Sequence, residues 1–117
     1  PEDNHVKQFL FLRKDLKDFS TGALVAQGCH AAIAAIEKSK EDTGTMDYLG
    51  LLEDMTTVVY GIGEKDMCSI MEGLDSFGVK YHLWLENRQI PTCIATAPVD
   101  LFQNKSFDKF RKKFRLF

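Results

Sequence analysis

Residues 21–36 read TGALVAQGCHAAIAAI, and the other elements of the chain are interpreted around this stretch. Its apolar residues recur at about 100° per residue, which predicts a long helix. One face is apolar and mostly bulky, made of Val25, Ala26, Cys29, Ala32, Ile33 and Ile36. A second face is mostly small, made of Leu24, Gly28, Ala31 and Ala35. We expect both faces to be buried, so that the helix is packed on two sides.

A narrow polar arc runs between these two faces. It carries Gln27 and His30, which lie one helical turn apart and are flanked by alanines. Small neighbours leave space beside an amide and an imidazole, which makes this arc the first candidate for a functional site. Spacing alone also allows a packing role for the two side chains, and packing is the commoner role of a lone helical histidine.

The segment before the helix predicts a strand and a helix cap. Residues 6–12 are rich in aromatic and branched side chains and indicate a first, central strand. Charged residues 13–16 end this strand, and Ser20 or Thr21 can cap the helix that follows. The helix N-terminus then directs backbone N–H groups toward the space above the strand end, where anions are favoured.

Downstream of the helix, hydrophobic periodicity predicts a second and a third helix, three strands and a last amphipathic helix. The second helix begins near Thr45, with an apolar stripe that reaches Met55, and is followed by a strand over 56–62 and a helix over 63–77. Strands over 79–85 and 90–96 come next, joined by a polar turn. The last helix carries Phe107, Phe110 and Phe114. The order β-α-α-β-α-β-β-α predicts an α/β three-layer sandwich with a mixed, roughly four-stranded sheet. We expect residues 1–117 to form a single domain.

Composition excludes several classes of protein. The 117 residues carry a formal net charge of −2, which excludes a generally basic, histone-like binder. Three widely spaced cysteines support neither a disulfide framework nor a zinc site, so we expect no metal and a reducing, cytoplasmic location. No apolar run is long enough to predict a membrane span. The sequence begins at Pro1 rather than Met, which leaves open a removed leader.

Four motifs carry a family resemblance. RKDL at 13–16, GALVAQGCHAA at 22–32, the turn at Glu86 and TCIATAP at 92–98 resemble the archaeal and eukaryotic type-2 peptidyl-tRNA hydrolases. LWLE at 83–86, TCIA at 92–95 and KFRLF at 113–117 are similar, more closely, to the peptidyl-tRNA hydrolase domain-containing branch of that family. The resemblance covers nearly the whole chain.

The resemblance implies a reaction and a set of residues. The reaction is hydrolysis of the ester that joins a peptide to the terminal ribose of tRNA, without metal or cofactor. By motif position, the catalytic residues would be Gln27, His30, Thr92 and Glu86, which stands where the family usually has Asp. Glu86 or His30 would polarise the attacking water, Gln27 and the helix N-terminus would hold polar groups of the substrate, and Thr92 would orient a hydroxyl or water.

The partner that the resemblance implies is tRNA or peptidyl-tRNA, with a homodimer left open. Phosphate contacts are expected from basic residues near the strand end and the hairpin turn, namely Arg13, Lys14, Lys17 and Arg88. Thr21 and Ala23 stand where family hydrolases usually carry lysines. This departure keeps a second function open, in which a catalytically weakened member of the family serves as a tRNA-binding or protein-interaction module.

Overall fold

The structure is a computed structural model and describes residues 5–117; the prediction about a leader rests on residues outside this range. The helices are α1 (Thr21–Lys38), α2 (Thr43–Gly50), α3 (Met67–Ser76) and α4 (Lys105–Arg111). The strands are β1 (Val6–Arg13), β2 (Thr57–Ile62), β3 (Tyr81–Glu86), β4 (Ile90–Thr96) and β5 (Val99–Asp100). Short 3-10 turns at Leu52–Asp54 and Glu64–Asp66 precede β2 and α3.

The strands form one mixed sheet in the order β2-β1-β4-β3, with β5 also paired to β1. β1 runs parallel to β2 and antiparallel to β4, and β3 is antiparallel to β4. The mixed sheet is confirmed, but it has five strands rather than about four. β5 was missed because two residues are too short to show a period.

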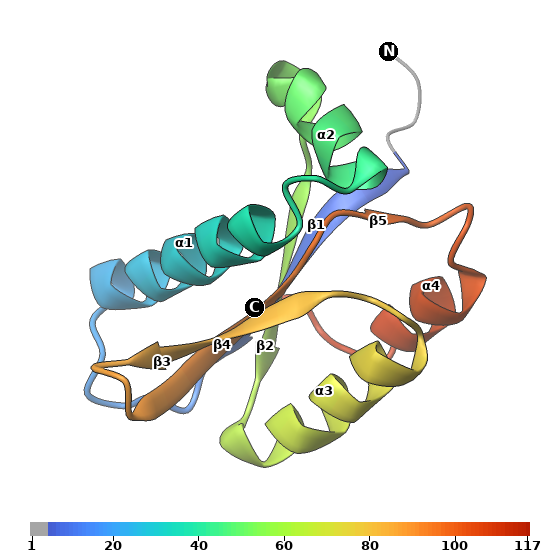
Figure 1. Cartoon of the computed structure of the whole chain (residues 1–117). Helices are drawn as coiled ribbons and strands as arrows, with labels where there is room; N and C mark the ends of the chain where they lie inside the picture. The colour runs from blue at the N-terminus through green and yellow to red at the C-terminus, as the bar shows by residue number, and fades with distance from the viewer. Residues whose placement is uncertain (1–4) are drawn as a thin grey trace.

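Helices cover both faces of the sheet, as the three-layer prediction requires. α1 lies on one face, and α3 and α4 lie on the other (Figure 1). The larger core, on the face covered by α3 and α4, contains Phe9, Phe11, Ile70, Leu74 and Phe107, each with no exposed surface. The smaller core lies beneath α1 and contains Leu10, Leu12, Ala31, Ala35, Cys93 and Ala95.

The two faces of α1 differ from the prediction. Its small face is buried against the sheet, whereas Val25 and Ile33 of the bulky face are 60% and 69% exposed. The prediction that both faces are buried was therefore wrong. A Cβ added at Gly28 would lie 3.3 Å from Leu10 Cδ2, so the small residues let the helix approach the sheet closely.

The second helix is also shorter than predicted. It ends at Gly50, and only Tyr48 of its predicted apolar stripe is buried. Leu51, Leu52 and Met55 are more than half exposed. At the other end of the chain, Phe114 packs on the larger core although it lies beyond the last residue of α4. No helix within residues 5–117 is both long and apolar enough to cross a membrane.

The C-terminal residues run along the outer edge of β2. The N–H of Gly61 donates to the Arg115 carbonyl at 3.0 Å, and the N–H of Phe117 donates to the Val59 carbonyl at 2.9 Å. Leu116 forms an antiparallel bridge with Tyr60. Residues 115–117 thus occupy this rim of the sheet through backbone hydrogen bonds.

Candidate functional site

A β-bulge in β4 shapes the site. Trp84 of β3 pairs with Cys93, but the next residue, Leu85, pairs with Pro91, so Thr92 is an extra residue between them. Successive side chains of a regular strand point to opposite faces. Here Cys93 packs in the core beneath α1, and Thr92 also contacts α1. The bulge therefore turns Thr92 toward the same helix.

Thr92 holds the side chain of Gln27. Its hydroxyl donates to Gln27 Oε1 at 2.8 Å, and the two residues are 0% and 3% exposed. No described residue accepts a hydrogen bond from the Gln27 amide nitrogen, and this nitrogen is not fully buried. The nitrogen therefore reaches accessible surface with both N–H donors free. Gln27 was predicted to lie beside open space, and only its amide end does so.

His30 and Glu86 are linked through Trp84. The imidazole of His30 lies 4.8 Å from the Trp84 ring, tilted by 32°, and is exposed at its outer side. The indole N–H of Trp84 donates to Glu86 Oε1 at 3.2 Å. The four residues that the family resemblance selected thus lie on three neighbouring elements, α1, β3 and β4.

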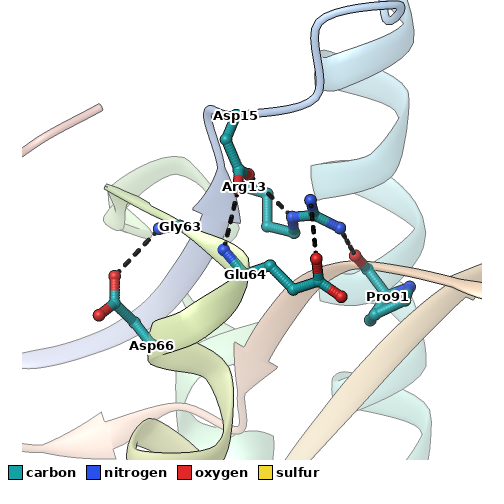
Figure 2. Close-up of polar contacts among 6 residues, drawn as sticks. All are labelled: Arg13, Asp15, Gly63, Glu64, Asp66 and Pro91. Atoms are coloured by element: carbon teal, nitrogen blue, oxygen red, sulfur yellow. Dashed lines mark hydrogen bonds and ion pairs between the residues drawn. The ribbon is translucent and has the colours of Figure 1, made fainter.

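Arg13 is held inside a polar cluster at the end of β1. Figure 2 shows its guanidinium reaching Asp15, Glu64 and the Pro91 carbonyl. The N–O distances are 2.8 Å to Asp15, 3.5 Å to Glu64 and 2.9 Å to Pro91. Asp15 also accepts from the backbone N–H of Glu64 at 3.1 Å. Arg13 therefore joins β1 to the turn before α3 and to the start of β4.

This cluster sets the charge state of Asp15. The hydrogen bond from Arg13 lowers the pKa of the Asp15 carboxyl against the opposing effect of burial. Asp66 caps the same turn by accepting from the N–H of Gly63 at 3.0 Å. Arg13 itself is only 7% exposed. Its guanidinium is thus engaged by the protein, which leaves little of it to meet phosphate.

The other three predicted phosphate contacts are exposed. Lys14, Lys17 and Arg88 form no ion pair with any residue in the described range 5–117. Arg88 lies at the tip of the β3–β4 hairpin, where it and Asn87 have φ of 62° and 52°. Positive φ at two consecutive residues is typical of tight hairpin turns, in which glycine is preferred at the second.

The N-terminus of α1 offers further donors. Of the two predicted caps, Ser20 rather than Thr21 is the one observed, because its hydroxyl accepts from the N–H of Ala23 at 3.1 Å. The N–H groups of Thr21 and Gly22 find no acceptor in the part of the chain that the structure describes. They are first-turn donors that a helix cannot satisfy internally, and they carry the positive end of its dipole.

Two titratable groups lie deeper beneath α1. Burial lowers the pKa of His82, and the nearby charge of Lys38 lowers it further. Burial raises the pKa of the Cys93 thiol to about 12, so this cysteine stays protonated and is a poor nucleophile. No group of three or more His, Cys, Asp or Glu residues that could hold a metal ion occurs within residues 5–117.

Sequence reasoning missed the link between Trp84 and Glu86. Trp84 packs against the smaller core beneath α1, and its indole N–H donates to Glu86. The available signal was their spacing, because residues i and i+2 of a strand share one face.

An apolar groove of about 560 Å³ lies beside α1, where the helix leaves the sheet uncovered. It is lined by Leu10, Leu12, Leu24, Val25, Cys29, Val59 and Phe117, among others. The exposed side chain of Val25 borders this groove rather than filling a core.

Comparison with known proteins relates the chain to one family. The model of the family described as peptidyl-tRNA hydrolase PTH2 matches residues 6–117. The mouse protein named "Putative peptidyl-tRNA hydrolase PTRHD1" is 40% identical over 116 residues, which cover 94% of this chain and 81% of that protein. The human protein of the same name is 39% identical over 116 residues, with the same coverage of both chains. A fowlpox virus protein named "Putative peptidyl-tRNA hydrolase" is 32% identical over 110 residues, which cover 85% of this chain and 83% of that protein.

Proposed function

The chain belongs to the peptidyl-tRNA hydrolase PTH2 family, and from this membership we propose that it hydrolyses the ester bond of peptidyl-tRNA. The products are free peptide and tRNA. The reaction class is carboxylic ester hydrolysis on an N-substituted aminoacyl-tRNA, with the ester carbonyl as the site of attack.

The chemistry needs four groups in one place. A water must be aimed at the ester carbon, a base must take its proton, donors must stabilise the developing oxyanion, and the leaving ribose oxygen must receive a proton. The free N–H donors of Gln27 suit the oxyanion or a polar group of the substrate. The carboxylate of Glu86 and the imidazole of His30 are the two candidate proton acceptors.

Thr92 has a different role in this proposal. Its side chain has no exposed surface and its hydroxyl is donated to Gln27, so it does not face a substrate. We assign it the task of holding the Gln27 amide in one orientation. A fixed donor loses little entropy when the oxyanion forms, which favours the transition state over a freely rotating amide.

One observation supports the proposal: the Thr92–Gln27 pair and the contacts of Trp84 with Glu86 and His30 lie on the neighbouring elements α1, β3 and β4. The residues come from three separate stretches of sequence. They supply amide donors, a carboxylate and an imidazole from neighbouring elements.

The test is single-turnover cleavage of an N-blocked aminoacyl-tRNA by the purified protein. We expect Gln27→Ala, His30→Ala and Glu86→Gln each to slow cleavage, by about 10²-fold or more for a proton acceptor. Gln103→Ala and His5→Ala replace the same residue types away from the site and should cleave at the parent rate. Full activity in all three site variants would overturn the residue assignment.

A second function is favoured by the helix entry of α1. Thr21 and Ala23 occupy positions where lysines are usual in the family, so a cation near the ester is missing there. In this alternative the chain binds tRNA without cleaving it. Two results together would favour a tRNA-binding module over a hydrolase. The parent protein would bind tRNA with an affinity that falls steeply with salt, and it would cleave no faster than the Glu86→Gln variant. Affinity that hardly changes with salt would contradict phosphate recognition altogether.

A further inference from the structure

Trp84 contacts both candidate proton acceptors of the site. It is the only tryptophan of the chain. Its indole N–H lies 3.2 Å from Glu86 Oε1, and its ring lies 4.8 Å from the imidazole of His30. Trp84 is partly buried on β3, where it packs against the smaller core beneath α1 and pairs with Cys93 of β4. One partly buried ring therefore touches a group on α1 and a group at the end of β3.

The Glu86 carboxylate needs such a contact. Glu86 is the last residue of β3, and the turn that follows it is exposed. A glutamate has one more rotatable bond than the aspartate usual at this position, so its carboxylate can sample more orientations. Trp84 can only donate a hydrogen bond, and Oε1 of Glu86 accepts it. The contact therefore orients the carboxyl group and leaves Oε2 without a hydrogen bond from the described residues, where it can accept a proton from water.

We propose that Trp84 is a positioning residue that fixes the Glu86 carboxylate and the His30 imidazole relative to each other for ester hydrolysis. The inference rests on the proposed function, because positioning matters only if the two groups act on a substrate. It assigns Trp84 two separable tasks. The N–H orients Glu86, and the ring face supports His30.

The first test separates these tasks with Trp84→Phe, which keeps an aromatic ring beneath His30 but removes the N–H. We expect the single-turnover rate at saturating substrate to fall about tenfold, as for loss of one hydrogen bond to a charged group, with half-saturation unchanged. In a Glu86→Ala background the same substitution should change the rate by less than about twofold, because no carboxylate remains to be oriented. Equal losses in both backgrounds would overturn the positioning role and indicate a merely structural one.

The second test does not depend on cleavage. A single tryptophan gives a single indole N–H signal in a ¹H–¹⁵N NMR spectrum. We expect Glu86→Ala to move this signal, whereas Glu72→Ala, on α3 at the opposite face of the sheet, should leave it in place. An unmoved signal would overturn the contact.

The two tests together distinguish the two failures. Cleavage by the parent protein with equal losses in both backgrounds would overturn the role of Trp84 and leave the proposed function standing. A moved indole signal without cleavage by the parent protein would overturn the proposed function, and with it the catalytic consequence of the contact.

Discussion

Arg13 shows how a residue predicted to bind the substrate is used by the fold instead. Its guanidinium donates to the carbonyl of Pro91, the residue before Thr92, and Thr92 in turn holds Gln27. The end of β1 is thereby tied to the side chain that presents the amide donors. Arg13 thus supports the residues around Thr92 through the backbone, whereas Lys14, Lys17 and Arg88 are exposed.

We expect Arg13→Met to lower the free energy of unfolding by about 1–3 kcal/mol, because it removes charge-assisted hydrogen bonds from a buried guanidinium. Urea denaturation measures this change. Lys17→Met is the matched control, since Lys17 is exposed and should change stability by less than about 0.5 kcal/mol. The control should instead reduce the salt dependence of tRNA binding. The reverse pattern would make Arg13 a phosphate contact.

Asp15 predicts a stability change at acid pH. Its pKa is lowered in the folded protein, so the stability that it contributes is present above the unfolded pKa of about 4 and is lost as pH falls through the folded value. We expect Asp15→Asn to cost less than about 1 kcal/mol at pH 7, because the carboxylate is partly exposed and screened. The difference from the parent should shrink as pH falls below the unfolded pKa and vanish once Asp15 is protonated in both the folded and the unfolded state. Urea titrations at pH 7 and through the acid range test this, and a difference that persists at the lowest pH would contradict it.

Arg88 occupies a position that costs stability. A non-glycine residue at a φ of 62° is strained, and Asn-Gly is the preferred pair for such turns. We expect Arg88→Gly to raise the free energy of unfolding by about 0.5–1 kcal/mol while weakening tRNA binding. Arg88→Ala separates the effects, because it removes the charge and keeps the strain. Equal stability of the two variants would refute the strain.

At the scale of elements, Gly73 lets α3 approach α4. A Cβ at this position would lie 2.8 Å from the ring of Phe110, which is itself packed edge-on against Phe77 and Phe114. We expect Gly73→Ala to destabilise the protein by about 1–2 kcal/mol, since the clash outweighs the gain in helix propensity. Gly44→Ala is the control, because nothing lies within 4 Å and the propensity gain of about 0.5–1 kcal/mol is unopposed. Thermal unfolding of both variants measures the difference, and equal stabilities would mean that the ring moves aside freely.

Elements with one strong pattern could be predicted from sequence, and those with two competing patterns could not. The fourth strand was predicted at 90–96 and is observed at Ile90–Thr96, because its turn and its branched residues agree. In α1 both faces are apolar, so periodicity located the helix without showing which face meets the sheet. The small face meets it, because small residues permit a shorter distance between the helix and the sheet.

The candidate site was predictable only as separate residues. Family motifs selected Gln27, His30, Glu86 and Thr92, but not which of them touch. The Gln27–Thr92 contact depends on a bulge, which is a register effect between two strands and leaves no periodic signal in either one. The engagement of Arg13 depends likewise on Asp15, Glu64 and Pro91, which come from three separate stretches of the chain.

At the scale of the whole molecule, the three thiols should report on opening of the fold. Cys29 and Cys68 are exposed, whereas Cys93 has no exposed surface in the sheet and burial raises its pKa to about 12. We expect a thiol reagent to label two cysteines rapidly in the native protein. Cys93 should react only through unfolding, at a rate that rises with urea. Rapid labelling of all three thiols in the native state would show that the region beneath α1 opens locally.

The C-terminal tail has a consequence for behaviour at high concentration. β2 reads TVVYGI, a charge-free segment of branched and aromatic residues at the rim of the sheet. Such edges are templates on which chains add strand by strand into aggregates. In this protein the outward N–H of Gly61 and the carbonyl of Val59 are already hydrogen-bonded to Arg115 and Phe117. Residues 115–117 thus protect the edge of β2 from strand addition, and that edge stays closed to other copies only while these residues occupy it.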